Sequence, residues 1–151
     1  MRIALLGPPG AGKGSLASRC EERLGLTHLS TGNIFRQEIA RHSLLGRRVQ
    51  RFVTAGKLVP DSLVVTVMVA RLRRLPHTKG VVLDGFPRTV GQARGLQAAR
   101  SRGGRLDGVV YLETPQAVLI ARLAGRRVCA RCGANFHLRT MRPRRAGRCD
   151  R

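Results

Sequence analysis

The most constraining feature of this chain is a glycine-rich segment that joins an apolar strand to a helix. Residues 3–6 are uniformly apolar, and residues 7–15, with the sequence GPPGAGKGS, follow them directly. From Lys13 to Leu24 apolar side chains recur at helical spacing. Glycines let consecutive backbone N–H groups turn toward one anion, and the helix N-terminus adds its positive end. The segment therefore predicts a phosphate-binding loop.

Within this loop, Lys13 supplies a mobile charge for the outer phosphates of a nucleotide. The spacing from Gly7 to Gly12 fits the phosphate-binding pattern with one departure: Gly14 stands where Ser or Thr is usual, and Ser15 comes next. An ordinary glycine-rich turn would not require a lysine here. The residues expected to hold ATP phosphates are Gly10, Ala11, Gly12, Lys13, Gly14 and Ser15.

The rest of the chain alternates short apolar runs with helical patterns, which predicts an open parallel α/β sheet. Further strands are expected at Thr27–Leu29, Val81–Leu83 and Gly108–Leu112. Ser30 and Thr31 offer an N-cap for a helix that runs through Ile39. The other expected helices are Leu45–Ala55, Leu63–Leu75, Thr89–Arg102 and Pro115–Ala124. After Gly125 the periodicity disappears, so we expect a small separate lobe at 126–151.

Charge and cysteines narrow the class of protein. The formal net charge is +21 in 151 residues, but the arginines spread along the whole chain. This spread favours an enzyme that acts on polyphosphate nucleotides over a specific nucleic-acid binder. A basic zinc protein that binds nucleic acid is the alternative of the second kind. No segment suits a targeting signal or a membrane span, so a cytoplasmic protein is expected. Its four cysteines are then thiols or metal ligands.

Three of these cysteines have metal-ligand spacing. Cys129 and Cys132 form a C-x-x-C pair, and Cys149 follows after sixteen residues, which fits three positions of a four-ligand zinc site. The fourth ligand would fall at position 152. Zinc in this lobe would be structural, and weakly held by residues 1–151 alone. Cys20 is expected to be a buried thiol. No catalytic role is predicted for His28, His42, His77 or His137.

Four further segments make the pattern specific. They are residues 30–36 (STGNIFR), 56–61 (GKLVPD), 84–89 (DGFPRT) and 125–129 (GRRVC). Together with the glycine-rich loop, they resemble, in the same order, the signatures of the adenylate kinase family of nucleoside monophosphate kinases, in the bacterial form with a zinc-binding lid. The resemblance extends from one end of the chain to the other.

The resemblance implies a doubly wound parallel α/β sheet of the P-loop kind, with helices on both faces. It implies a core at 1–29 and 60–125, a helical AMP-binding insertion at 30–59 and a partial lid at 126–151. The implied activity is reversible phosphoryl transfer between ATP and AMP that yields two ADP. The expected partners are these nucleotides with Mg²⁺, and the protein is expected to be a monomer with no membrane and no specific nucleic-acid partner.

The resemblance also assigns residues. Arg36 and Arg88 would hold the AMP phosphate, a task that suits guanidinium groups. Thr31 and Gln92 would read the adenine. The remaining residues expected at the AMP site are Lys57, Leu58, Val59, Gly85, Phe86 and Pro87.

On the ATP side, Arg122 and Arg126 would neutralise charge during transfer. They are four residues apart, and we expect them to share one face of a helix before the lid. Asn135 and Phe136 match the lid segment over the adenine of ATP. Asp84 ends a buried strand, where its carboxylate can hold Mg²⁺ through water.

Two departures are local: Ser15 keeps the hydroxyl of the usual Thr, and Asn33 replaces a common Asp. Family members also continue past the lid with arginines, a fifth strand and a terminal helix. Residues 1–151 alone would therefore leave the strand at 109–112 at an open sheet edge. The alternatives to adenylate kinase are a GMP or UMP/CMP kinase, or a nucleotide-binding remnant without turnover.

Overall fold

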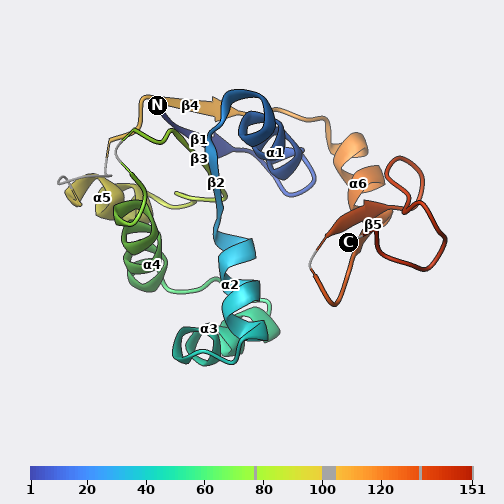
Figure 1. Cartoon of the computed structure of the whole chain (residues 1–151), viewed down its shortest axis with the longest axis horizontal. Coiled ribbons are helices and arrows are strands. Elements are labelled where there is room, and N and C mark those ends of the chain that lie inside the picture. Colours follow the sequence, from blue (N-terminus) through green and yellow to red (C-terminus); the bar gives the residue numbers. More distant parts are fainter. Residues whose placement is uncertain (77, 100–104, 133, 151) are drawn as a thin grey trace. The chain divides into compact units, whose positions relative to one another are not determined.

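The chain was analysed as a computed structural model that describes residues 1–76, 78–99, 105–132 and 134–150 (Figure 1). Its centre is a four-stranded parallel sheet in the order β2-β3-β1-β4. The strands are β1 (Arg2–Leu6), β2 (Thr27–Ser30), β3 (Val81–Asp84) and β4 (Gly108–Tyr111). This arrangement confirms the predicted α/β class. No helix in the described ranges is both long enough and apolar enough to cross a membrane.

The two inner strands are buried because their sequences are almost wholly apolar. Val81, Val82 and Leu83 of β3 are at most 1% exposed, and so are Ala4 and Leu5 of β1. Leu5 lies opposite Asp84 in the register, so the carboxyl ends of β1 and β3 lie side by side. Open parallel sheets bind their ligands at this edge. The glycine-rich loop follows β1 at this edge, and Asp84 is the last residue of β3 there.

Helices connect the strands close to the predicted bounds. They are α1 (Lys13–Leu24), α2 (Thr31–Ala40), α3 (Leu44–Thr54), α4 (Asp61–Arg73), α5 (Val90–Ala98) and α6 (Gln116–Ala124). α4 begins two residues earlier than predicted, directly after Pro60, because a proline is well tolerated at a helix start. α5 was predicted to reach Arg102, but residues 100–104 lie outside the described part of the chain.

Side-chain caps explain where three helices begin. Ser30 accepts a hydrogen bond from the backbone N–H of Asn33 at 3.4 Å, which confirms the predicted cap of α2. Ser43 caps α3 through the N–H of Gly46 at 2.9 Å, and Thr89 caps α5 through the N–H of Gln92 at 3.1 Å. Each cap satisfies an N–H group that has no partner inside its helix.

The chain divides into two compact units. The first comprises Met1–Leu6 with Lys13–Tyr111, and the second comprises Gly7–Gly12 with Leu112–Arg151. In the first unit α2 and α3 pack against each other beyond the end of β2 (Figure 1). The core of this unit includes Phe35, Val49, Met68 and Phe86. The expected boundaries at residues 30, 60 and 126 stay a prediction.

The second unit contains a hairpin that the sequence did not predict. Strands β5 (Arg126–Val128) and β6 (Asn135–His137) pair antiparallel. α6 ends at Ala124 with Gly125 as its C-cap, so Arg126 lies in β5 and not in the helix of Arg122. The expectation that these two arginines share one helix face is therefore wrong. Glycine is a common helix terminator, which is the physical reason.

β4 is one of the two outer strands of the sheet in the described residues, and its place at an edge was predicted. Val109, Val110 and Tyr111 are 56%, 42% and 65% exposed, so this strand is covered on neither face. An uncovered apolar edge strand offers unpaired N–H and C=O groups to any other strand.

Candidate active site

The glycine-rich loop has the backbone conformation that its glycines predict. Gly7, Gly10 and Gly12 have φ angles of 137°, 86° and 102°, which other residues rarely adopt. A Cβ on Gly7 would lie 2.7 Å from the carbonyl oxygen of Leu112, so no side chain fits there. Ala11 N–H donates to the carbonyl of Pro8 at 3.2 Å, which closes the turn. The second unit thus presents this loop as a compact turn.

Arg122 of α6 reaches this turn. Its guanidinium Nη1 donates to the carbonyl oxygens of Gly10 and Ala11, each at 3.3 Å. A Cβ on Gly10 would lie 3.1 Å from Leu123 Cγ, so α6 packs tightly against the loop. The structure therefore brings together two elements predicted to lie at the ATP phosphates, whose contacting residues are 111 and 112 positions apart in the chain.

In the first unit, Asp84 lies beside the beginning of α1. A Cβ on Gly14 would lie 3.4 Å from Asp84 Oδ2. This is an ordinary contact distance, so the first turn of α1 lies directly beside the carboxylate. Asp84 is partly buried at the carboxyl end of β3, and its side chain is 15% exposed. Such a carboxylate is an oxygen ligand of the kind that Mg²⁺ prefers, directly or through water.

His28 is the partner of Asp84 that the sequence analysis missed. Its Nε2 lies 3.3 Å from Asp84 Oδ2, and its side chain is only 11% exposed. The histidine comes from β2, which is hydrogen-bonded directly to β3. The sequence places His28 in one predicted strand and Asp84 at the end of another. The contact could have been predicted only if these two strands had been expected to be neighbours, and the order of the strands was not predicted. His77 lies outside the described residues.

A second polar cluster forms around Gly85. The carbonyl of Gly85 accepts hydrogen bonds from Thr31 Oγ1 at 3.1 Å and from Arg88 Nε at 2.8 Å. Gly85 has φ 76°, and a Cβ there would lie 2.6 Å from an Arg88 guanidinium nitrogen. Three residues from two motifs, 30–36 and 84–89, are thus held in one place. A side chain at position 85 would displace the arginine.

Gln92 extends this cluster from the first turn of α5. Its side-chain oxygen accepts from the N–H of Arg88 at 2.8 Å, and its Nε2 donates to Asp61 Oδ1 at 2.8 Å. Thr89 Oγ1 donates to the other Asp61 oxygen at 2.6 Å. Gln92 is 4% exposed, so these bonds fix its amide orientation. Asp61 and Thr89 support the cluster, a role that the sequence did not predict for either residue.

The other residues expected at an AMP site differ in exposure. Phe86 is completely buried and Val59 is 9% exposed, whereas Leu58 is 70% exposed. Lys57 and Arg36 are exposed too. Arg36 donates to Asn33 Oδ1. Asn33, which stands where Asp is common in the family, thus contacts another residue of α2.

In the lobe, Arg126 contacts Asn135 across the hairpin. Its Nε and Nη2 donate to Asn135 Oδ1 at 3.1 and 2.6 Å. Phe136 is the next residue of β6, opposite Arg127, and is half-buried. His137 Nδ1 accepts from the N–H groups of Arg139 and Thr140, which holds the turn after β6. The hairpin thus joins two sets of predicted ATP-side residues.

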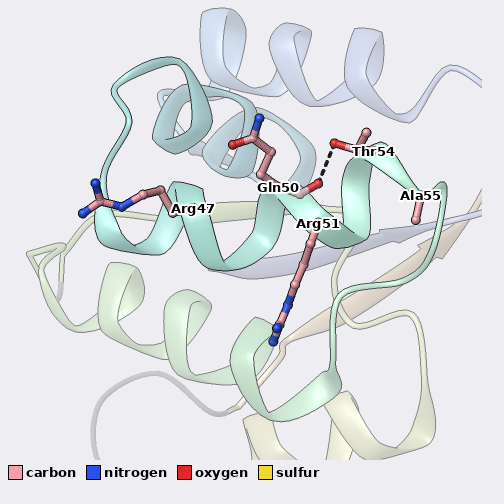
Figure 2. Close-up of a pocket in the computed structure, with 5 residues that line it drawn as sticks. All are labelled: Arg47, Gln50, Arg51, Thr54 and Ala55. Carbon is pink, nitrogen blue, oxygen red and sulfur yellow. Dashed lines mark hydrogen bonds between the residues drawn. The ribbon is translucent and has the colours of Figure 1, made fainter.

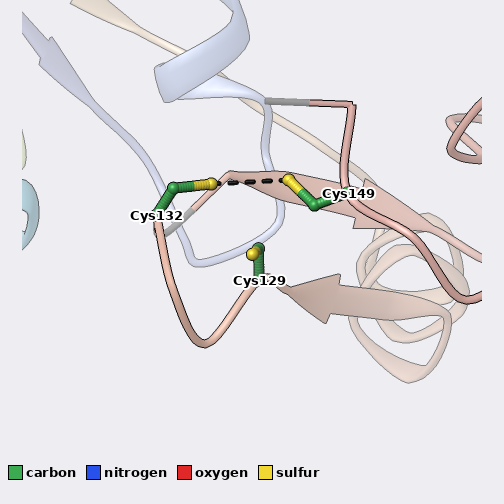
Figure 3. A group of neighbouring side chains, drawn as sticks. All are labelled: Cys129, Cys132 and Cys149. Atoms are coloured by element: carbon green, nitrogen blue, oxygen red, sulfur yellow. Dashed lines mark hydrogen bonds between the residues drawn. The ribbon is translucent and has the colours of Figure 1, made fainter.

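The predicted cysteine ligands lie together, as Figure 3 shows. The sulfurs of Cys129, Cys132 and Cys149 all lie within 4.8 Å of one another, and those of Cys132 and Cys149 are 3.4 Å apart. Tetrahedral zinc with Zn–S bonds of about 2.3 Å places its sulfurs roughly 3.8 Å apart. The three thiols therefore fit a zinc ion.

Backbone hydrogen bonds prepare one of these thiols for metal binding. The pKa of Cys129 is lowered from its ordinary 9.0 to about 7, first by the backbone N–H of Cys132 and next by that of Arg131, which donate to its sulfur. Thiolates are the form that binds metal. Asp150, which follows Cys149, accepts instead from the N–H of Arg144 at 2.8 Å.

The parallel sheet, the positive-φ loop after β1 and the guanidinium group of Arg88 beside Gly85 are typical of a nucleotide-binding phosphotransferase. Comparison with known proteins agrees. The family model for adenylate kinase matches residues 5–149. An adenylate kinase of Moorella thermoacetica is 47% identical over 99% of this chain, and one of Symbiobacterium thermophilum is 45% identical over 100% of it. The chain spans about 70% of the length of each. It belongs to the adenylate kinase family, whose members are phosphotransferases that act on ATP and AMP.

Proposed function

We propose that this protein transfers the terminal phosphoryl group of ATP to AMP, reversibly, with two ADP as products. In the forward step the bond from the γ-phosphorus to the bridging oxygen breaks, and a phosphate oxygen of AMP forms the new bond. The observation that carries the proposal is the cluster of Thr31, Arg88 and Gln92 around Gly85. Membership of the family and the phosphate loop with Arg122 support it.

In this proposal the AMP phosphate is held by Arg36 and Arg88, whose planar groups suit two-pronged contacts to phosphate oxygens. Thr31 and Gln92 select adenine, because a buried amide that is already oriented discriminates strongly between bases that match it and bases that do not. The backbone of residues 57–59 and residues 85–87 complete this site.

The ATP phosphates are assigned to the backbone N–H groups of residues 10–15, to Lys13 and to Arg122. Arg126, Asn135 and Phe136 are assigned to the ATP side of the lobe. Phosphoryl transfer involves little covalent chemistry by the protein, so catalysis depends on positioning and on neutralising charge. Lys13, Arg88, Arg122 and Arg126 would do so, and the carboxylate of Asp84 would hold the Mg²⁺ that accompanies ATP.

The lobe is proposed to hold structural zinc through Cys129, Cys132 and Cys149. Bound zinc would tie β5 and β6 to the segment around Cys149, because a lobe this small buries little apolar surface of its own. We also propose that the protein is a cytoplasmic monomer. Cysteines with metal-ligand spacing are typical of a reducing compartment.

Nucleotide binding tests the assignment of the two sites. Lys13→Ala should weaken ATP binding by about 2 kcal/mol, since a charge-assisted contact is lost. Lys79→Ala, which removes an exposed lysine outside the site, is the matched control. Isothermal calorimetry measures both. Equal ATP affinity in the two variants would refute the phosphate-loop assignment.

Gln92→Ala should reduce the preference for AMP over GMP, CMP and UMP and leave ATP affinity unchanged. Gln97→Ala, on the exposed side of the same helix, is the control. A preference for another monophosphate in the unmodified protein would favour the related kinases. If ATP and AMP affinities fall together in Gln92→Ala, the division into two nucleotide sites is wrong.

A further inference from the structure

A strongly basic face lies on α3 and includes none of the nucleotide residues named above. Arg47, Gln50, Arg51, Thr54 and Ala55 line a shallow depression of about 500 Å³ (Figure 2). A second depression of about 370 Å³ shares Arg47 and Arg51 with the first and is also lined by Leu44 and Arg48. We call Arg47, Arg48 and Arg51 the α3 arginines. All three are exposed.

The charge of this face is not neutralised within the described part of the chain. No carboxylate there forms an ion pair with the α3 arginines. α3 contains no acidic residue, and Glu38 is the only one in α2. The carboxylate of Glu38 is already occupied: it accepts from Ser43 Oγ at 2.6 Å and from Arg71 Nη2 at 2.9 Å. The positive charge therefore remains available to a partner.

The fold holds this face in place. Ser43 caps α3, and a Cβ on Gly46 would lie 2.1 Å from the carbonyl of Glu38, so α3 packs directly on the backbone of α2. Val49 is completely buried on the inner side of the helix. Arg51 lies over the ring of Phe52, with the guanidinium carbon 4.8 Å from the ring centre. A partner meets charges that are already arranged, which lowers the entropy lost on binding.

The same packing argues against a membrane or an apolar partner. Leu45, Val49 and Phe52 contribute the apolar side of α3 to the protein core. Leu44 and Val53 are exposed, but they are nine residues apart and so lie on opposite sides of the helix. Membrane-surface helices need a continuous apolar face to insert. α3 presents its exposed arginines with only the isolated Leu44 and Val53 among them, and therefore has no continuous apolar face.

Guanidinium groups at this spacing suit a chain of phosphates. Arg47 and Arg51 are one helical turn apart, about 6 Å along the axis, with Arg48 beside them. Each presents a fork of donors that matches phosphate oxygens. Proteins that bind unpaired bases stack them on exposed aromatic rings, whereas the Phe52 ring is half-buried beside Arg51. The face is therefore suited to the backbone of a paired duplex.

We propose that the α3 arginines form a binding surface for the phosphate backbone of duplex nucleic acid, without sequence preference. The net charge of +21 adds a long-range attraction that brings such a polyanion to the protein. The contacts would be to phosphates, which position a protein on a duplex and carry no sequence information. This surface is separate from the residues assigned to ATP and AMP.

Fluorescence anisotropy with a labelled, mixed-sequence DNA duplex tests the proposal. The triple variant Arg47→Gln, Arg48→Gln, Arg51→Gln is compared with the control Arg19→Gln, Arg23→Gln, Arg94→Gln. Both remove three exposed arginines, so their net charges are equal. We expect the α3 variant to lose more than about tenfold in affinity, and the slope of log affinity against log salt to fall by about 3, roughly 0.9 for each contact. The control variant should retain most of the duplex affinity and most of the salt dependence.

Equal losses in the two variants would overturn the proposal, because general charge would then explain the binding. Tighter binding to a single strand, or to anionic lipid vesicles, would overturn it too. Thermal unfolding by circular dichroism checks both variants. If the glutamine variant unfolds, the triple substitution to lysine keeps the charge; it should retain duplex binding, and its failure to do so while folded contradicts a phosphate surface. ATP and AMP affinities are measured beside these and test the kinase assignment independently.

Discussion

The contact between His28 and Asp84 belongs to the scale of single residues. The imidazole is nearly buried and lies 3.3 Å from the carboxylate proposed to hold Mg²⁺. Residues that orient a metal-binding group usually matter almost as much as the group itself. We therefore expect His28 to act as a positioning residue, because its contact favours one orientation of the Asp84 carboxylate.

We predict that His28→Gln reduces the Mg²⁺-dependent part of ATP affinity by about tenfold, a typical cost of losing such a partner. ATP affinity measured in EDTA should not change, because the phosphate loop is intact. Calorimetry with and without Mg²⁺ separates the two, and His42→Gln, at an exposed turn position, is the control. A loss of equal size in EDTA would mean that His28 acts on the fold and not through Asp84.

Cys129 allows a prediction about pH. Its pKa of about 7 means that the thiolate fraction rises through half at about pH 7 in the metal-free protein, and not at 9. Alkylation requires the thiolate, so the rate at Cys129 should rise with pH to a plateau with a midpoint of about 7. Peptide mapping after iodoacetamide treatment at a series of pH values measures it. Bound zinc should suppress the reaction, and a midpoint near 9 would contradict the hydrogen-bonded thiolate.

At the scale of elements, apolar periodicity and caps were sufficient to locate helices. α1 was predicted to the residue because its apolar positions and the loop before it fix both ends. The strands β5 and β6 escaped because each has three residues, with little burial to produce an alternating pattern. Because β5 was not predicted, Arg126 was placed on the preceding helix. Short exposed strands depend on their partner, and the partner is not visible in the local sequence.

The predicted site residues show a similar division. The motifs located Thr31, Gly85 and Arg88 in the chain, the family resemblance added Gln92, and the structure brings these four together. The sequence did not predict Asp61 and Thr89 as their supports, because those bonds depend on how α4 and α5 pack. Arg122 contacts the loop, and its assignment to the ATP phosphates, which came from the family resemblance, stays a prediction.

The packing of α2 on α3 predicts a large effect from one methyl group. Gly46→Ala would place a Cβ 2.1 Å from the Glu38 carbonyl, so the two helices must separate. Overpacking of this kind typically costs about 1–3 kcal/mol of unfolding free energy. Gly108→Ala is the control, since no atom lies within 4 Å of its Cβ; its change should stay within about 0.5 kcal/mol. Urea unfolding measures both, and similar values would contradict the close helix contact.

At the scale of the whole molecule, the 151-residue chain combines complete nucleotide motifs with an uncovered sheet edge. β4 has exposed valines on an outer strand, and α6 has exposed Val118, Ile120 and Leu123. Exposed apolar surface of this size lowers the margin of stability, which for domains is typically about 5–15 kcal/mol. Relatives of this chain are longer, and the aligned part is about 70% of them. Nucleotide binding and catalytic turnover should therefore be considered separately for a polypeptide of residues 1–151.

We predict that a polypeptide of residues 1–151 alone binds ATP and AMP but has little adenylate kinase turnover. Ground-state binding draws on the loop, Arg36, Arg88 and Arg122, all of which are present. Turnover also requires that water be excluded and that the transferring group be surrounded by positive charge. Each missing stabilising group typically costs about a hundredfold or more in rate. The sequence resemblance predicts that several such groups follow position 151 in family members.

The measurement is a coupled assay of ADP formation on the purified 151-residue polypeptide. Beside it runs a version extended at its C-terminus with the corresponding segment of the Moorella thermoacetica relative, which is 47% identical over the shared part. Calorimetry on both checks that ATP still binds, so that a failure to fold is not read as a failure of chemistry. The extended version should be faster by at least about a hundredfold. Equal rates would show that residues 1–151 already contain every group that the transfer requires.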